Sequence, residues 1–524
     1  MFDVLIVGSG AAAAAAALGL RGLRVAVLDV GYEPDYEGLP PGRLYDIRRT
    51  SSDLFASLIG RNFEAFETLH GQRVSPKLKT PGMACVTKNW RSFYALESSN
   101  FDPALSLAKG GFANAWGAGC FRFSHEELRS FPFHPTELDP HYDALTAELG
   151  ISGCKDDLSE FWGTTDGLLP PLELSPWALQ FLSRYTKQRP AFRKAGIFVG
   201  RPRVAVLTRN LGERRAYGYQ TRDFFEPHQP SIYTPVFTID RLIREGCITY
   251  LPGHFVERIE ERRGHLEVRT TCLKTNDSSI FSAKKCILAA GAIGSARIAL
   301  NSFAQARERI PLRENPLSFM VLFDPRRLGK GQESMGFGGA QISIVYRSPA
   351  AEPVQASVYD LSAVLRNDIL FDLPFSVKSL PELARLLVPS FLVVQVFYPD
   401  DSPLGQGSIC WPGDGSMRID FRENLTRGKL EWLLARKLLK LGYFTAPPMW
   451  RYPVSGLCYH YAGTLPMHRQ AEGFQCHPDG RLAVSRHTYV ADAANFPTLP
   501  SKNLTFTAMA NAMRIATLLK VSSF

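Results

Sequence analysis

The first thirty residues alternate apolar runs with small residues in a pattern that predicts a strand, a helix and a second strand. Residues 2–7 form a short, continuously apolar run, which is typical of a parallel strand buried on both faces. A glycine turn and an alanine-rich stretch over residues 11–17 follow, and a second apolar run over residues 24–28 ends at Asp29. We therefore expect one βαβ unit of a parallel sheet in a protein of the α/β class, α+β overall.

The turn of this unit has the features of a dinucleotide cradle. In Gly8-Ser9-Gly10, the first glycine suits a tight turn and the second lets the backbone approach a pyrophosphate, while Ala13 stands where helix and strand pack closely. The helix N-terminus then presents free N–H groups to the phosphates. Asp29 follows Gly10 by 19 residues, a spacing that suits a carboxylate binding the ribose hydroxyls. FAD and NAD remain equally compatible with this segment.

Two further segments are expected to complete the cradle. Residues 285–302 contain an apolar strand, the turn Ala290-Gly291 and the start of a small-residue helix. The turn after a parallel strand faces the cofactor edge of such a sheet. Residues 248–259 resemble a pair of strands, with Val256 placed for a backbone contact to an adenine ring.

A glycine-flanked loop over residues 109–117 is a candidate for packing against a flat ring. Its sequence is KGGFANAWG, in which Gly110 and Gly111 allow close backbone approach, and Asn114 and Trp116 can hydrogen-bond or stack. On composition alone, a glycine-rich surface loop with a buried tryptophan is an equally good interpretation.

Composition narrows the class of protein. The chain has 524 residues, of which 45% are hydrophobic and 21% charged, values typical of a soluble globular enzyme of two or more domains. The net charge is +10, but the basic residues are dispersed and form no arm for nucleic acid. Nine cysteines without a CxxC pair favour free thiols in a reducing compartment, and the strand that starts at residue 2 leaves no room for a signal peptide before it. We therefore expect a cytoplasmic protein.

The C-terminal part offers two candidate catalytic side chains. His460 precedes a turn at Gly463-Thr464, and Asn503 follows it by 43 residues, just before a helix expected over residues 504–519. The N-terminus of that helix would present unpaired N–H groups to negative charge developing on a reduced flavin. Alone, a histidine is more often structural than catalytic.

The remaining chain carries little further chemistry. No haem motif, Cys/His metal set or GxSxG nucleophile elbow occurs in the sequence, so no metal site is predicted. Residues 427–443 form a basic amphipathic helix pattern, and residues 361–398 are rich in leucine, valine and phenylalanine but too interrupted to span a membrane. Both could contact a membrane or an electron acceptor, although a helix and strands facing the core are the favoured interpretation.

Taken in order, these segments resemble the glucose–methanol–choline (GMC) family of FAD-dependent oxidoreductases. The resemblance covers most of the chain and rests on the N-terminal GxGxxA together with five further motifs: KGGFANAWG (109–117), FHPTELDPHYDALTAELGISG (133–153), ILAAGAIGSARIAL (287–300), YHYAGT (459–464) and VADAANFPTLPSKNLT (490–505). It implies a Rossmann-like FAD-binding domain with a parallel sheet, made of residues 1–35, 80–124, 201–302 and 451–524. It also implies a substrate domain with an antiparallel sheet covered by helices, made of residues 125–200 and 303–450.

The resemblance also implies roles for individual residues. His460 matches the family's catalytic base, and Asn503 matches the second active-site position, which is His or Asn in the family. Because an amide has no basic nitrogen, Asn503 can only orient the substrate oxygen, and His460 is left as the sole base. Asp492 and Ala493 match the stretch along the FAD pyrophosphate and ribityl chain. Asn503, Leu504 and Thr505 are expected beside the flavin.

Two departures from the family pattern affect these expectations. Leu504 replaces the proline that usually follows the active-site asparagine, which leaves an additional backbone N–H in that loop. The tryptophan loop resembles the branch with pyranose oxidases and fructose dehydrogenases. In pyranose oxidases a histidine before that tryptophan is bonded to the flavin, and Ala115 stands there in this chain. We therefore predict non-covalent FAD.

The predicted activity is oxidation of a primary or secondary alcohol, with a hydride passed to flavin N5. The resemblance of the tryptophan loop implies that this alcohol is a sugar or polyol. The electron acceptor, which is oxygen, a quinone or a redox protein, is left open by the sequence. Two alternatives belong to other classes: a lyase of the same fold that keeps FAD without net redox chemistry, and a non-catalytic FAD-binding protein.

Overall fold

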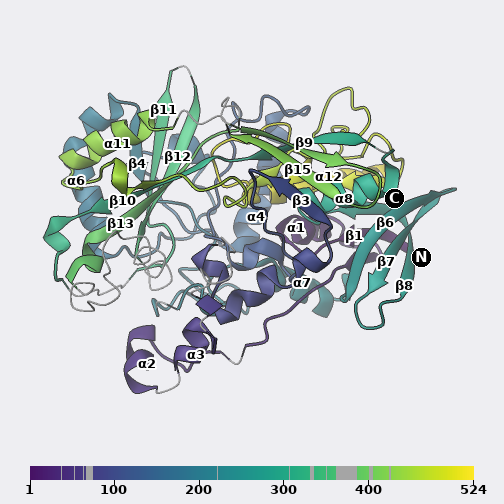
Figure 1. Cartoon of the computed structure of the whole chain (residues 1–524), viewed down its shortest axis with the longest axis horizontal. Helices are drawn as coiled ribbons and strands as arrows, with labels where there is room; N and C mark the ends of the chain where they lie inside the picture. Colours follow the sequence, from purple (N-terminus) through teal and green to yellow (C-terminus); the bar gives the residue numbers. More distant parts are fainter. Residues whose placement is uncertain are drawn as a thin grey trace.

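The computed structural model describes residues 1–36, 38–51, 54–62, 64–65, 75–220, 222–305, 307–330, 336–349, 351–361, 386–400, 405–423 and 427–523. Three sheets organise this part of the chain (Figure 1). Most of the apolar stretch predicted over residues 361–398 lies outside the described residues; its end forms strand β13 (Phe391–Phe397).

A seven-stranded sheet carries the predicted N-terminal unit. Its order is β5-β2-β1-β8-β7-β6, with β18 paired to β8. The strands β5, β2, β1, β8 and β18 run parallel to their neighbours in this group. Strand β7 pairs antiparallel with both β8 and β6. The strands are β1 (Phe2–Val7), β2 (Val25–Leu28), β5 (Ile248–Leu251), β6 (His254–Arg262), β7 (His265–Cys272), β8 (Ser278–Leu288) and β18 (Thr488–Val490).

Helices at both ends of the chain pack together beside this sheet. The alanines of α1 (Ala11–Gly19) are buried, and a side chain at Gly19 would lie 2.9 Å from the Ala516 Cβ in α12 (Thr505–Ser523). Small residues on both helices permit this close approach. The C-terminal helix is thereby held beside the N-terminal cradle, as Figure 1 shows for the two ends of the chain.

A six-stranded antiparallel sheet forms the second layer, in the order β16-β10-β13-β12-β11-β4. One face packs against helices α6 (Pro176–Arg193) and α11 (Lys429–Lys440), at the left of Figure 1. Leu434 and Leu438 of α11 are buried there, which confirms a core-facing helix within residues 427–443. The strands are β4 (Ile197–Gly200), β10 (Leu317–Phe323), β11 (Ile342–Ser348), β12 (Ala351–Asp360), β13 (Phe391–Phe397) and β16 (Trp450–Arg451).

A five-stranded sheet joins segments from both predicted domains. Its order is β17-β9-β14-β15-β3, with β3 (Leu96–Ser99) and β17 (Tyr461–Ala462) from the segments assigned to the FAD-binding domain. The strands β9 (Glu308–Glu314), β14 (Gly405–Trp411) and β15 (Met417–Glu423) come from the segment assigned to the substrate domain. The short strand β17 begins directly after His460, so this sheet helps to position the candidate base.

The other helices of the described chain are α2 (Leu44–Thr50), α3 (Leu54–Ile59), α4 (Asp139–Leu149), α5 (Ser159–Trp162), α7 (Pro235–Arg244) and α8 (Ala292–Phe303). Among the described residues, no helix is both long enough and apolar enough to cross a membrane. The predicted fold class, a Rossmann-like parallel sheet with a helix-covered antiparallel sheet, is confirmed.

Candidate active site

The turn after β1 is built for close approach of another group. Gly8 has φ +97°, and a Cβ there would lie 2.6 Å from the Ala289 carbonyl oxygen. At Gly10 the space that a side chain would fill has no atom within 4 Å. Helix α1 begins at Ala11 without a side-chain cap, so its first N–H groups remain available to a phosphate. Ala13 is fully buried, as close packing at that position requires.

The loop over residues 109–117 is joined directly to this turn. Ser9 Oγ donates to Asp29 Oδ2 and accepts from the Gly110 N–H at 2.9 Å. Gly111 faces Gly10, since a Cβ built on Gly111 would lie 3.5 Å from the Gly10 Cα. The two predicted glycine segments therefore form one cradle.

Trp116 and Asn114, the two side chains of the loop that were predicted to contact a ring, each donate a hydrogen bond to a backbone carbonyl. Trp116 is partly exposed, and its Nε1–H donates to the Tyr233 carbonyl at 2.8 Å. Asn114 Nδ2 donates to the Lys109 carbonyl at 2.8 Å, while its buried Oδ1 has no partner in the described part of the chain. An unpaired buried acceptor beside an open glycine cradle fits a bound group that carries hydrogen-bond donors, as FAD does.

Asp29 lies at the end of β2, in the position that the spacing predicted. Tyr250 donates to its Oδ2 at 3.0 Å, and burial raises the pKa of Asp29 to about 6. The Asp29 carbonyl accepts from the N–H of His254, which places Val256 two residues farther along β6. The Val256 carbonyl accepts from Arg297 Nη1 at 2.9 Å.

The second βα turn is tied to the C-terminal motif by Asp492. Asp492 Oδ2 accepts from the Gly291 N–H at 2.8 Å and from Ser295 Oγ at 2.5 Å. Burial raises the pKa of Asp492 to about 6. Both predicted alanines lie beside this hydrogen-bonded link. The Ala290 N–H donates to Ser295 Oγ, and Ala493 directly follows Asp492 in the chain. The predicted cofactor residues at 290–291 and 492–493 are therefore brought together.

The two candidate catalytic side chains lie next to each other. His460 Nε2 is 3.5 Å from Asn503 Nδ2, and the Phe397 ring of β13 stacks on the imidazole with ring centroids 5.1 Å apart. Burial lowers the pKa of His460 to about 4, so the imidazole is neutral at pH 7. Leu504 and Thr505 follow at the start of α12, where the Leu504 carbonyl accepts the Ala508 N–H.

Asn315 determines which nitrogen of His460 carries the proton. The Asn315 Nδ2 donates to the carbonyls of Tyr398 and Pro500, each at 2.9 Å, so its Oδ1 must face the other way. That Oδ1 lies 3.0 Å from His460 Nδ1 and can only accept. The hydrogen therefore sits on Nδ1, and the lone pair of Nε2 faces Asn503 as a base requires.

The same argument extends beyond His460. Because Nε2 has no proton, Asn503 presents its N–H to it, and the Asn503 Oδ1 accepts from Gln355 Nε2 at 3.3 Å. Asn315 and Gln355 were both missed by the sequence analysis. Only the alternation of polar Gln355 and Ser357 with apolar neighbours in β12 could have drawn attention to that strand.

The residue before His460 has an unusual backbone. Tyr459 has φ +60°, in the left-handed region that a tyrosine rarely adopts. Its hydroxyl accepts the Ser75 N–H at 2.7 Å, and its ring stacks on Phe112. Upstream, the buried Glu314 accepts the N–H groups of Gly456 and Cys458. These contacts fix the direction in which the His460 side chain points.

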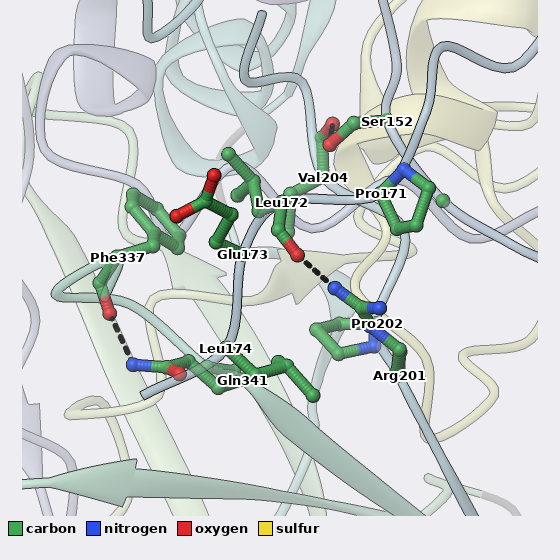
Figure 2. A pocket seen from close by; sticks show the side chains of 12 residues that line it. Ser152, Pro171, Leu172, Glu173, Leu174, Arg201, Pro202, Val204, Phe337 and Gln341 are labelled. Carbon is green, nitrogen blue, oxygen red and sulfur yellow. Dashed lines mark hydrogen bonds between the residues drawn. The ribbon is translucent and has the colours of Figure 1, made fainter. Parts of the chain in front are cut away.

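Other hollows in the described chain lie elsewhere. Figure 2 shows one that Arg201, Glu173, Phe337 and Gln341 help to line, with an accessible volume of only ≈ 20 Å³, room for about one water molecule. A more open one of ≈ 510 Å³ is lined by Tyr217, His228 and their neighbours. Neither is lined by His460 or Asn503. The described residues contain no group of three or more potential metal ligands, and all nine cysteines are free.

Comparison with known proteins agrees with this geometry. Residues 449–512 match the family model of GMC oxidoreductase (C-terminal domain), and this segment contains both His460 and Asn503. The C-terminal segment of the chain is thus similar to the C-terminal domain of GMC oxidoreductases, in agreement with the resemblance found in the sequence. No curated protein sequence matches the chain.

Solved structures share the fold over the whole chain. Pyridoxine 4-oxidase from Mesorbium loti is 14% identical, with a TM-score of 0.60 and 100% of both chains covered. An R554A variant of formate oxidase from Aspergillus oryzae RIB40, studied for FAD modification, is 12% identical, with a TM-score of 0.62 and coverage of 100% of this chain and 98% of that chain. At these identities the likeness concerns the fold.

Proposed function

We propose that this protein oxidises an alcohol group, of a sugar or polyol in the first instance, with His460 as the base. The observation that carries the proposal is the neutral imidazole whose Nε2 keeps its lone pair and lies 3.5 Å from the Nδ2 of Asn503. Bound in the cradle of residues 8–10 and 110–111, FAD would take up the hydride from the carbinol carbon.

The hydroxyl of an alcohol matches this pair of groups because it both donates and accepts. Its O–H would donate to His460 Nε2, and its oxygen would accept from Asn503 Nδ2. His460 would then remove the proton while Asn503 holds the oxygen that becomes a carbonyl. The stacked Phe397 ring and the Asn315 hydrogen bond keep the imidazole in place during this transfer.

FAD is proposed to be held without a covalent bond. Ala115, a buried residue in the ring-binding loop, has no nucleophilic atom with which to bond a flavin. Asp29 would bind the adenosine ribose, and the helix N-terminus at Ala11 would bind the pyrophosphate.

The proposed function is tested by the absorbance of the purified protein under anaerobic conditions. After acid precipitation we expect a yellow supernatant with the spectrum of free FAD, whereas a yellow pellet would contradict non-covalent binding. Before precipitation, one member of a panel of sugars, polyols and simple alcohols is expected to bleach the flavin. Protein-bound FAD that no alcohol bleaches would support the lyase or the non-catalytic alternative. Re-oxidation by air, a quinone or neither then identifies the class of electron acceptor.

Asp29→Asn is expected to raise the dissociation constant of FAD by roughly 10- to 100-fold, since hydrogen bonds to a charged group contribute about 1.5–3 kcal/mol. Because the pKa of Asp29 is about 6, wild-type affinity should also fall as the pH drops through 6 and the carboxylate is protonated. Equilibrium dialysis with FAD at pH 5 and pH 8 measures both effects. Asp3→Asn, near the start of the neighbouring parallel strand β1 and so at the opposite end of the strands from Asp29, is the matched control and should leave FAD affinity unchanged. Equal affinity of wild type and Asp29→Asn would remove Asp29 from the ribose site.

A further inference from the structure

Gln355 lies in the middle of β12, on the sheet face that looks toward His460. The residue is 1% exposed, and its Nε2 donates to Asn503 Oδ1 at 3.3 Å. Ser357 and the half-buried Gln395 of β13 project from the same face, because β12 and β13 pair with Ser357 opposite Gln395 and Gln355 opposite Phe397. These polar side chains lie on the sheet face opposite to the one that packs against α6 and α11.

The orientation of the Gln355 amide follows from the chain of hydrogen bonds that begins at Asn315. Two backbone carbonyls determine the amide orientation of Asn315, and Asn315 determines which nitrogen of His460 is protonated. The unprotonated His460 Nε2 then determines that Asn503 faces it with Nδ2. Asn503 therefore offers an oxygen to Gln355, and only the N–H side of Gln355 can meet it.

The Gln355 Oε1 is consequently an acceptor that points away from Asn503. It is buried, and it has no hydrogen-bond partner among the described residues. Ser343 Oγ, opposite Ser357 on the adjacent strand β11, is likewise buried and unpartnered there. Buried polar atoms in folded proteins normally have partners, so unpaired ones in contact with a catalytic residue indicate a place where a ligand supplies the missing donor.

We propose that Gln355 is a substrate-binding residue whose Oε1 accepts a hydrogen bond from a second hydroxyl group of the substrate. The proposal rests on the oxidation of an alcohol at His460. While the reacting hydroxyl lies at His460 and Asn503, the second hydroxyl pairs with Gln355 on the far side of Asn503. The site therefore selects diols and larger polyols over alcohols with a single hydroxyl.

The experiment compares α,ω-diols from ethane-1,2-diol to hexane-1,6-diol with the monoalcohols of the same chain length. Flavin reduction is followed anaerobically with FAD-loaded protein, and kcat/KM is determined with the electron acceptor found above. For at least one chain length, wild type is expected to prefer the diol by roughly tenfold or more, because a monoalcohol leaves Oε1 unpaired. In Gln355→Met, which keeps the length and removes the acceptor, that ratio should fall to about one through loss of activity on the diol.

The outcomes separate this proposal from the function on which it rests. Flavin that no compound of the series reduces contradicts alcohol oxidation at this site. Reduction with equal efficiency by diols and monoalcohols in wild type contradicts the role of Gln355, and this measurement needs no variant. A variant that loses activity equally on both compounds shows that Gln355 only positions Asn503. The matched control is Gln395→Met, one strand away, which should keep the wild-type ratio; loss of the ratio there as well would overturn the assignment to Gln355.

Discussion

Replacing His460 by alanine is expected to slow flavin reduction by about 10²- to 10⁴-fold while the protein keeps its FAD, because that range is the usual contribution of a general base. The contacts of His460 lead to Asn315, Asn503 and Phe397 and not to the glycines of the cradle, so the protein should keep its FAD. Anaerobic stopped-flow measurement of flavin bleaching gives the rate, and the FAD to protein absorbance ratio gives the loading.

The pH dependence of the same reaction has a defined sign. Burial lowers the pKa of His460 to about 4, and the protonated imidazole has no lone pair for the substrate hydroxyl. The rate constant for flavin reduction in wild type should therefore be level from about pH 5 upward and fall as the pH drops through 4. In His460→Ala this fall should be absent. A rate unchanged by the substitution would show that His460 is structural.

Asn315→Leu serves as the companion variant for this prediction. It removes the acceptor that holds the proton on Nδ1 but retains the histidine itself as a base. Reduction should slow by less than in His460→Ala, since a fraction of the histidine would still have Nε2 free. Equal rates for wild type and Asn315→Leu would contradict the control of the tautomer by Asn315.

The sequence predicted those parts of the site whose signal is local. Gly8, Gly10 and Asp29 belong to one short unit in which turn, helix and strand follow each other, and the structure places them together. His460 and Asn503 were accessible because each belongs to a recognisable segment. Their adjacency is a tertiary contact that the spacing of 43 residues does not determine.

The residues that orient the base could not be predicted in this way. Asn315 is 145 residues from His460, and Gln355 is 148 residues from Asn503. Each is an ordinary polar residue in its own segment, and its partner is chosen only when the sheets pack. The parallel pairing of β3 with β15, which joins two distant parts of the chain, was unpredictable for the same reason.

Lys502, the neighbour of Asn503, is a position at which a single substitution should cost much of the protein's stability. Its ammonium group is bonded to Glu127 Oε2 and to the carbonyls of Arg122 and Phe161, and the side chains of Lys502 and Glu127 are 5% and 2% exposed. Lys502→Met leaves the Glu127 carboxylate buried without its cation. Breaking a buried pair in this way costs about 3–5 kcal/mol of unfolding free energy. Urea unfolding of the FAD-loaded protein, compared with wild type, measures the loss.

Part of the lost unfolding free energy should be recovered when the unpaired charge of Glu127 is also removed. In the double variant Lys502→Met/Glu127→Gln, the amide oxygen at position 127 can still accept the Ser124 N–H, now bonded to Glu127 at 2.6 Å, but no unpaired charge remains. The double variant should therefore be more stable than Lys502→Met alone, because most of the expected loss is the burial of an unpaired carboxylate rather than the attraction within the pair. Lys194→Met, at an exposed lysine after α6, controls for the substitution itself and should stay within about 0.5 kcal/mol of wild type. If the single and double variants were equally unstable, the loss would come from the hydrogen bonds of Lys502 to the two carbonyls and not from the unpaired charge of Glu127.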